Sequence, residues 1–139
     1  MRLQLALNVS DLDKAVDFYT RMFGVEPAKT RPGYANFAIA DPPLKLVLFE
    51  GQGEGGTINH LGVEAETADE VGAAEARLTH TGLETTGVDD TECCYAAKTE
   101  TWLTGPDGAR WEWYVKIADI DQFAAIAASN TGGNACCAR

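Results

Sequence analysis

Residues 4–24 read QLALNVSDLDKAVDFYTRMFG, and this stretch decides the fold. Its first six residues are typical of a short strand, and Ser10 follows as the expected N-cap of a helix, with Asp13 as a partner resembling a capping box. Gly24 is the expected helix stop. Between the cap and the stop, apolar side chains recur at helical spacing, namely Leu12, Ala15, Val16, Tyr19 and Met22.

The second half of the chain repeats this plan. Residues 60–65, HLGVEA, are again typical of a strand, and Thr67 with Glu70 forms a capping box. The helix that follows is expected to end at Gly82. Equivalent landmarks are 56 residues apart for Gln4 and His60, 57 for Ser10 and Thr67, and 58 for the two glycines. Such a near-constant offset indicates an internal repeat.

Three strand-like runs follow each helix. In the first half they cover 25–30, 34–40 and 44–50; in the second they cover 83–88, 98–104 and 110–116. The sequence therefore predicts an α+β fold of two tandem βαβββ modules, which form a half-open barrel around a metal cleft. We expect one domain over 1–116, with modules at about 1–50 and 57–116 joined by a glycine-rich linker at 52–56.

The remaining residues, 117–139, are expected to form a C-terminal helix and then a mobile tail with Cys136 and Cys137. One chain contains both modules, so a monomer suffices, and a homodimer stays open.

Composition excludes several classes of partner. The chain has 139 residues and a formal net charge of −10, which repels phosphate backbones and anionic membranes. No apolar run approaches the roughly 20 residues of a membrane span. The first residues enter a strand-like pattern directly instead of a signal peptide, so we expect a cytoplasmic protein with a small-molecule substrate.

Gln4 and His60 occupy equivalent positions in the first strand of each module, and Glu112 lies on the last strand of the second. Taken singly, each has an ordinary explanation: His60 as a packed histidine, the others as exposed strand residues. Taken together, they predict a metal site with three protein ligands. The fourth related position, near Leu46 and Val47, is apolar, so coordination positions remain for a substrate or dioxygen.

The chain has four cysteines, in two adjacent pairs. Cys93 and Cys94 directly follow an acidic, turn-like stretch, 89–92, and this setting fits poorly with burial of the pair as small apolar residues. Thiolates bind soft elements. Consecutive strand residues point to opposite faces, so we expect the pair in a loop or bulge if both are to bind one atom. A disulfide within the pair is not expected, because its ring would be strained.

The doubled βαβββ plan, the positions of Gln4, His60 and Glu112, and the turn at 105–108 resemble the vicinal oxygen chelate superfamily of glyoxalases, extradiol dioxygenases and bleomycin resistance proteins. The stretches 4–9, 59–63 and 91–96 resemble more narrowly the carbon–arsenic lyases. That resemblance implies non-haem Fe(II) on Gln4, His60 and Glu112, arsenic on Cys93 and Cys94, and dioxygen as co-substrate. It implies no catalytic residue beyond these ligands.

The resemblance implies oxygen-dependent cleavage of methyl or aryl groups from trivalent arsenic, with release of arsenite, and hence a role in arsenic detoxification. Two other functions stay open. One is non-catalytic sequestration of a thiophilic metalloid, metal or drug; the other is a glyoxalase-type isomerase, which would want a second glutamate near Leu46. Tyr95, Trp102 and Tyr114 line the substrate pocket or belong to the core.

Overall fold

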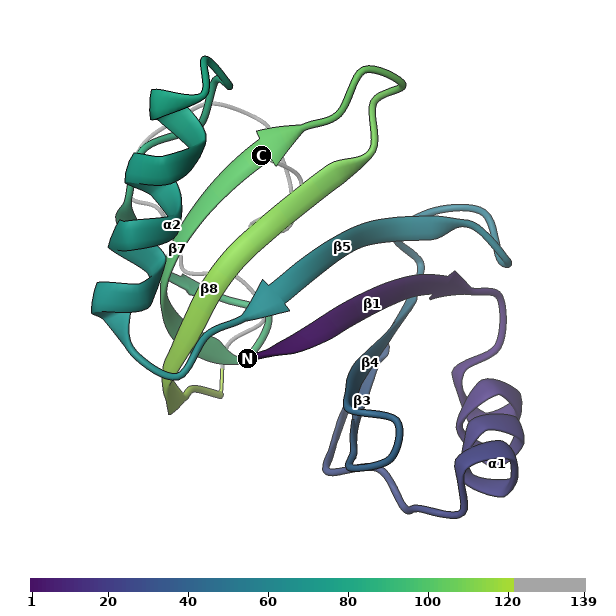
Figure 1. Cartoon of the computed structure of the whole chain (residues 1–139). Helices are drawn as coiled ribbons and strands as arrows, with labels where there is room; N and C mark the ends of the chain where they lie inside the picture. Colours follow the sequence, from purple (N-terminus) through teal and green to yellow (C-terminus); the bar gives the residue numbers. More distant parts are fainter. Residues whose placement is uncertain (122–139) are drawn as a thin grey trace. The chain divides into compact units, whose positions relative to one another are not determined.

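The computed structural model describes residues 1–121. These residues fall into two compact units, Met1–Val63 and a second that begins at Glu64. The elements appear in the order expected of two βαβββ repeats (Figure 1). The predicted α+β class and tandem modules are confirmed. The first strand of the second repeat, β5 (Ile58–Glu64), belongs almost wholly to the first compact unit.

In the first unit, one helix covers one face of the strands. The strands are β1 (Arg2–Val9), β2 (Lys29–Arg31), β3 (Tyr34–Ile39) and β4 (Leu44–Glu50), in the order β2-β3-β4-β1-β5. β1 pairs with β4 in parallel. The helix α1 (Leu12–Phe23) packs on alternate strand residues. These residues form an apolar core of Leu12, Ala35, Phe37, Ile39, Leu46 and Leu48.

The opposite face of β1 is polar yet buried. Gln4, Ala6 and Asn8 alternate with the core-facing leucines, and their exposed fractions are 5%, 0% and 6%. Alternation along a strand places all three on the face away from α1. The strand that looks amphipathic in sequence is therefore buried on both sides, and its second side holds one of the expected metal ligands.

In the second unit, α2 (Ala68–His80) packs against one face of its strands. These are β6 (Asp89–Cys93), β7 (Ala96–Thr104) and β8 (Arg110–Asp119), which pair antiparallel in that order. Ala65, Val71 and Val115 form the apolar contact beneath the helix, and Arg77 of α2 lies over the Trp113 ring. Glu112 and Tyr114 therefore lie on the face away from α2.

Both helices end next to the glycines that were predicted to stop them, but only one of the two predicted N-caps is correct. Thr67 and Glu70 form the expected capping box. Gly82 takes a φ of +88°, and the Leu83 N–H donates to the carbonyl of Leu78, which completes a Schellman motif. For α1 the predicted N-cap Ser10 is wrong: Asp11 accepts a hydrogen bond from the Lys14 N–H instead.

Two strand predictions are also wrong. The run at 25–30 shortens to Lys29–Arg31, because Pro27 cannot donate to a strand partner. Residues 83–88 form no strand. The Thr86 N–H donates to the carbonyl of Trp102 in β7, but the Trp102 N–H donates to the Thr86 hydroxyl oxygen instead of a backbone carbonyl. Gly87 then has a φ of +77°, outside the strand region. The strand lies one step later, at Asp89–Cys93, although this acidic stretch favoured a loop. Its pairing with β7 includes a hydrogen bond from Thr99 to Asp90.

β8 runs to Asp119, so the helix expected to start after residue 117 does not start there. Ala118 and Asp119 still pair with β7. The rest of that prediction, including Cys136 and Cys137, lies outside the described residues. Within residues 1–121, no helix is both long and apolar enough to cross a membrane.

We predict that Asp11→Ala lowers the free energy of unfolding by about 1 kcal/mol, because the first turn of α1 loses its side-chain acceptor. Ser10→Ala is the matched control and should change it by less than about 0.5 kcal/mol. Urea denaturation of both variants measures the difference. A larger loss for Ser10→Ala would place the cap where the sequence first suggested it.

Candidate functional site

The two adjacent cysteines lie at a tight hairpin turn. Cys93 ends β6 and pairs with Ala96 of β7, which leaves Cys94 and Tyr95 as a two-residue connection. Both turn residues have positive φ, 52° and 63°. Such a turn ordinarily uses Asn-Gly, and each non-glycine residue in this region costs about 1–2 kcal/mol. The sequence predicts a loop or bulge at the cysteine pair, and the structure has a strained two-residue turn that starts at Cys94.

The strained turn brings the two sulfur atoms together. The Sγ atoms of Cys93 and Cys94 are 3.2 Å apart, over an ångström more than a disulfide bond, so they are not bonded to each other. Both residues are buried, at 1% and 7% exposure. Cys93 is not in a disulfide, whereas Cys94 is disulfide-bonded. The Ile120 N–H donates to the carbonyl of Tyr95 at 3.0 Å and fixes the turn to the end of β8.

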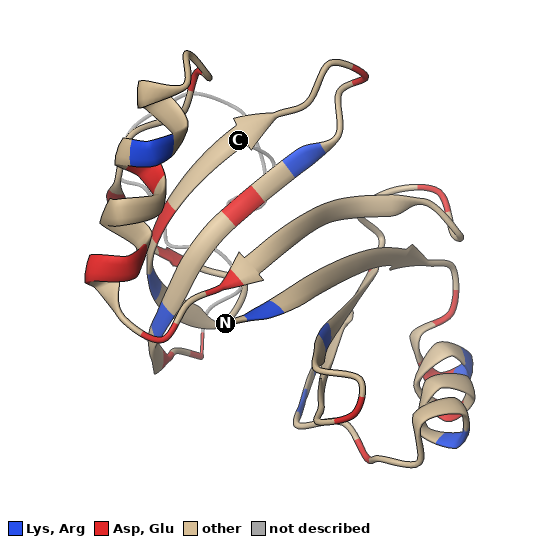
Figure 2. Ribbon diagram, viewed as in Figure 1, with Lys and Arg blue, Asp and Glu red and all other residues tan. Residues whose placement is uncertain are grey.

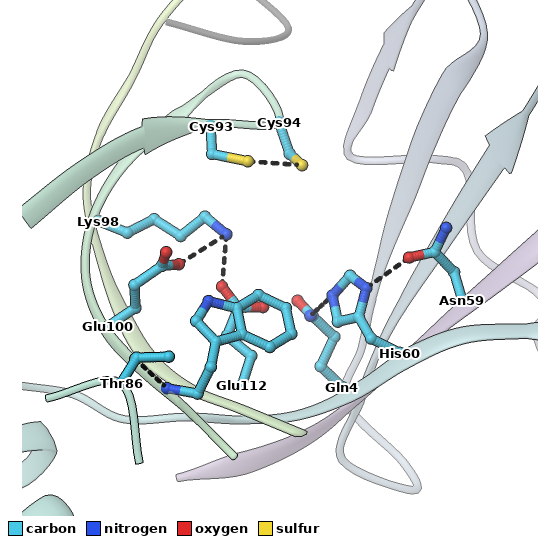
Figure 3. A network of polar contacts seen from close by, with 10 residues as sticks. Gln4, Asn59, His60, Thr86, Cys93, Cys94, Lys98, Glu100 and Glu112 are labelled. Atoms are coloured by element: carbon cyan, nitrogen blue, oxygen red, sulfur yellow. Dashed lines mark hydrogen bonds and ion pairs between the residues drawn. The ribbon is translucent and has the colours of Figure 1, made fainter. Parts of the chain in front are cut away.

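Glu112 is completely buried and bound to a lysine. The Lys98 Nζ donates to the Glu112 Oε1 at 2.5 Å and lies 3.5 Å from the Glu100 Oε2. Figure 3 shows the ammonium of Lys98 between the two carboxylates. Lys98 and Glu100 are themselves almost fully buried. One face of β7 and β8 therefore holds a charged cluster of Lys98, Glu100 and Glu112.

Burial and neighbouring charges together determine the pKa values in this cluster. Burial would lower the pKa of Lys98, but the carboxylates of Glu112 and Glu100 and the nearby Cys93 outweigh it, so the pKa of Lys98 rises above its ordinary value. Burial raises the pKa of Glu100, against the opposing effect of Lys98. The neighbouring carboxylates and Cys93 thus favour the charged form of Lys98.

The charged cluster includes aromatic partners. The Lys98 Nζ lies 5.1 Å from the centre of the Tyr114 ring, and the guanidinium of Arg110 lies 4.6 Å from that of Trp102. Both distances suit cation–π contact. Arg110, Glu112 and Lys116 produce the alternating blue and red segments along β8 (Figure 2). Tyr114 and Trp102 are thereby assigned to the buried face that holds Glu112.

In the first unit, Gln4 and His60 are in direct contact. The Gln4 Nε2 lies 3.0 Å from the His60 Nε2, and both side chains are buried. The His60 ring packs against Phe49 at 6.2 Å between centres. Its other nitrogen, Nδ1, lies 2.8 Å from the Asn59 Oδ1 (Figure 3). The structure thus brings together two of the three residues that the sequence suggests as metal ligands.

The expected metal ligands therefore lie in two places. Gln4 and His60 belong to the first compact unit and Glu112 belongs to the second. The donor types fit a divalent metal: an amide oxygen, an imidazole nitrogen and a carboxylate. Among the described residues, no three or more imidazole, thiol or carboxylate side chains gather as a metal site, and the expected set has only two of that kind.

Sequence reasoning missed Lys98 and Glu100. The pattern that could have revealed them is a lysine and a glutamate at alternate positions of one strand, which places both on the same face. If that face is buried, each charge needs an opposite charge beside it. The position near Leu46 and Val47 is apolar and buried, as expected. Glu50, at the end of that strand, accepts a hydrogen bond of 2.6 Å from the Leu12 N–H at the start of α1.

Comparison with known proteins shows the family of this chain. A model of the glyoxalase/bleomycin resistance protein/dioxygenase superfamily matches residues 3–113. The chain belongs to this superfamily. The fold class and the family resemblance drawn from the sequence are both confirmed.

Two relatives are similar to this chain over most of its length. A trivalent organoarsenical cleaving enzyme from Thermomonospora curvata is 53% identical over 98% of this chain and 87% of its own length. The cadmium-induced protein CadI from Mycobacterium tuberculosis is 58% identical over 88% of this chain and 80% of its own. Among solved structures, the Mn(II)-bound glyoxalase from Novosphingobium aromaticivorans matches at a TM-score of 0.58 and 19% identity, over 86% of this chain and 40% of that one. This last likeness concerns the fold alone.

We predict that Lys98→Met destabilises the metal-free protein by about 3–5 kcal/mol, because two buried carboxylates lose their cation. Lys116→Met, at an exposed lysine of the next strand, serves as the control and should cost less than about 0.5 kcal/mol. Chemical denaturation followed by tryptophan fluorescence measures both. Equal, small effects would mean that Lys98 is not what compensates the burial of Glu112.

Proposed function

We propose that this protein cleaves the carbon–arsenic bond of trivalent organoarsenicals with Fe(II) and dioxygen and releases arsenite. The observation that supports this most is the buried sulfur pair of Cys93 and Cys94. The relative from Thermomonospora curvata, whose name states this cleavage, supports the substrate class over almost the whole chain. We place the activity in the cytoplasm, where cysteines stay mostly reduced.

In this proposal, both sulfurs bind one arsenic atom. A soft centre bound to two thiolates at about 2.3 Å, the length of a Zn–S bond, needs its sulfurs about 3–4 Å apart, and the distance of 3.2 Å meets this. Cys94 acts in its reduced form. The strained turn fixes the two sulfurs before arsenic arrives, so little ordering remains to be done on binding.

Gln4, His60 and Glu112 would hold the iron, which supplies the activation of dioxygen when bound. The chain's own contribution is position: the thiols orient the arsenic–carbon bond, and burial excludes water from the reacting atoms. The ammonium of Lys98 fixes Glu112 through its hydrogen bond. The proposal requires no second chain, nucleic acid or membrane.

Loss of either thiol should abolish tight binding. For Cys93→Ser or Cys94→Ser we expect affinity for a trivalent methylarsenical to fall at least about 100-fold, because the second bond to a bound arsenic is effectively intramolecular. Equilibrium dialysis of protein kept reduced with a phosphine measures this without a competing dithiol. The proposal fails if the double variant binds the arsenical like the wild type.

Loss of a metal ligand should separate binding from turnover. His60→Ala is expected to bind the arsenical normally but to release no arsenite, whereas His80→Gln, at the other histidine of the chain, should behave as the wild type. The measurement is arsenite released by the reduced, Fe(II)-loaded protein in air and without oxygen. Release that is equal in both atmospheres would rule out the oxygen-dependent route.

A second function is favoured by one observation. The relative named cadmium-induced protein is 58% identical to this chain, and thiolates select soft cations as well as arsenic. If the protein sequesters such ions, Cd(II) and the arsenical should compete for Cys93 and Cys94, and no arsenite should appear in either atmosphere. Ultraviolet absorption from sulfur–cadmium bonds reports that competition directly.

A further inference from the structure

A line of hydrogen-bonded side chains leads from a backbone carbonyl to His60, within the first unit. The Thr57 hydroxyl donates to the Glu54 carbonyl at 2.5 Å, and the Asn8 Nδ2 donates to the Thr57 Oγ1 at 3.0 Å. The Asn59 Nδ2 donates to the Asn8 Oδ1 at 3.0 Å, and the Asn59 Oδ1 lies 2.8 Å from the His60 Nδ1. We call these residues, Thr57, Asn8 and Asn59, the relay.

The relay has a fixed direction. A hydroxyl has one hydrogen, and that of Thr57 is used on the Glu54 carbonyl, so its oxygen must accept from Asn8. The amide of Asn8 is thereby oriented with its oxygen toward Asn59. The amide of Asn59 is then oriented with its oxygen toward His60. An oxygen can only accept, so the hydrogen of the neutral imidazole must be on Nδ1.

The other side of the ring gives the same answer independently. The Gln4 Nε2 is an amide nitrogen, which can only donate, and it lies 3.0 Å from the His60 Nε2. Two donors would face each other if Nε2 were protonated. Figure 3 shows the ring held between Gln4 and Asn59, one at each nitrogen. Both neighbours therefore require Nε2 to present its lone pair.

Resting on the proposed function, in which His60 is a metal ligand, we propose that Asn8 and Asn59 are positioning residues for that metal. They hold His60 in the Nδ1-protonated tautomer before any metal arrives, so that Nε2 is ready to bind. If His60 Nε2 and the Gln4 amide oxygen are to hold the metal, the hydrogen bond from Gln4 to Nε2 would have to break. The metal-free protein thus uses Gln4 as a stand-in partner for the nitrogen that the metal takes.

The loop before β5 leaves space for the relay. A Cβ atom added at Gly53 would stand 2.7 Å from the Asn8 Nδ2, closer than side chains approach. The backbone also fixes Asn8: its N–H donates to the Thr57 carbonyl, and its carbonyl accepts from the Gly56 N–H, both at 2.9 Å. Gly53→Ala therefore offers a way to disturb the relay without touching His60 or its immediate neighbour.

The test is long-range ¹H–¹⁵N correlation spectroscopy of the metal-free protein above about pH 8, where an ordinary histidine is neutral. A His80→Gln background leaves the signals of His60 alone. We expect a protonated Nδ1 and an unprotonated Nε2. In Asn59→Ala the tautomers should mix or reverse, and in Asn59→Asp, which still offers an acceptor, the original tautomer should return.

A control variant and a second readout distinguish loss of the relay from a general loss of folding. Asn36→Ala removes another buried asparagine of the same unit, which bonds to the Tyr34 hydroxyl, and should leave the tautomer unchanged. Co(II) affinity, followed by visible absorption, should fall about 10–100-fold in Asn59→Ala and also fall in Gly53→Ala. A protonated Nε2 in the wild type, or an unchanged tautomer in Asn59→Ala, overturns the proposal.

The two proposals fail in different ways. If the tautomer behaves as stated but the wild type binds no divalent metal, the relay is real and the metal function is wrong. If Co(II) binds tightly and the tautomer does not depend on Asn59, the metal function stands and the positioning role is overturned.

Discussion

A buried carboxylate constrains the second half of this molecule more than any other group. Glu112 has no exposed surface, and an ion in that position is costly unless it is paired. Lys98 supplies the pair, and Glu100 shares the same ammonium. Such a cluster contributes little net stability compared with an apolar core of the same volume. Its presence in a small domain therefore favours a chemical role over a structural one.

In the first half, amide groups and an imidazole are buried in the same way. Gln4, Asn8 and His60 are buried on the face of the strands away from α1, and their polar atoms are bound to one another and to Asn59. In both units a helix covers an apolar face, whereas the opposite face buries polar side chains. The two thiols lie at the edge of the second of these faces, on a turn whose backbone is strained. Strain of that kind persists only where the surroundings impose it.

The sequence predicted the parts of this structure that depend on local pattern. The repeat and the capping box at Thr67 follow from spacing and residue type, and the structure agrees. The structure also brings Gln4 and His60, which occupy equivalent positions of the repeat, into contact. Ser10 and Asp11 are both good N-caps, and only backbone geometry selects Asp11. The strand at Asp89–Cys93 contradicts its weak propensity, because pairing with β7 decides it. The relay and the Lys98 cluster involve residues far apart in sequence, and alternation alone does not say which charges meet.

The central claim is that the turn at Cys93 and Cys94 is a dithiol site for arsenic. X-ray absorption at the arsenic edge, on reduced, iron-free protein loaded with one equivalent of a trivalent methylarsenical, tests this most directly. The account predicts two sulfur neighbours and one carbon on each arsenic, and one sulfur neighbour in Cys94→Ser. One sulfur or none in the wild type would contradict it.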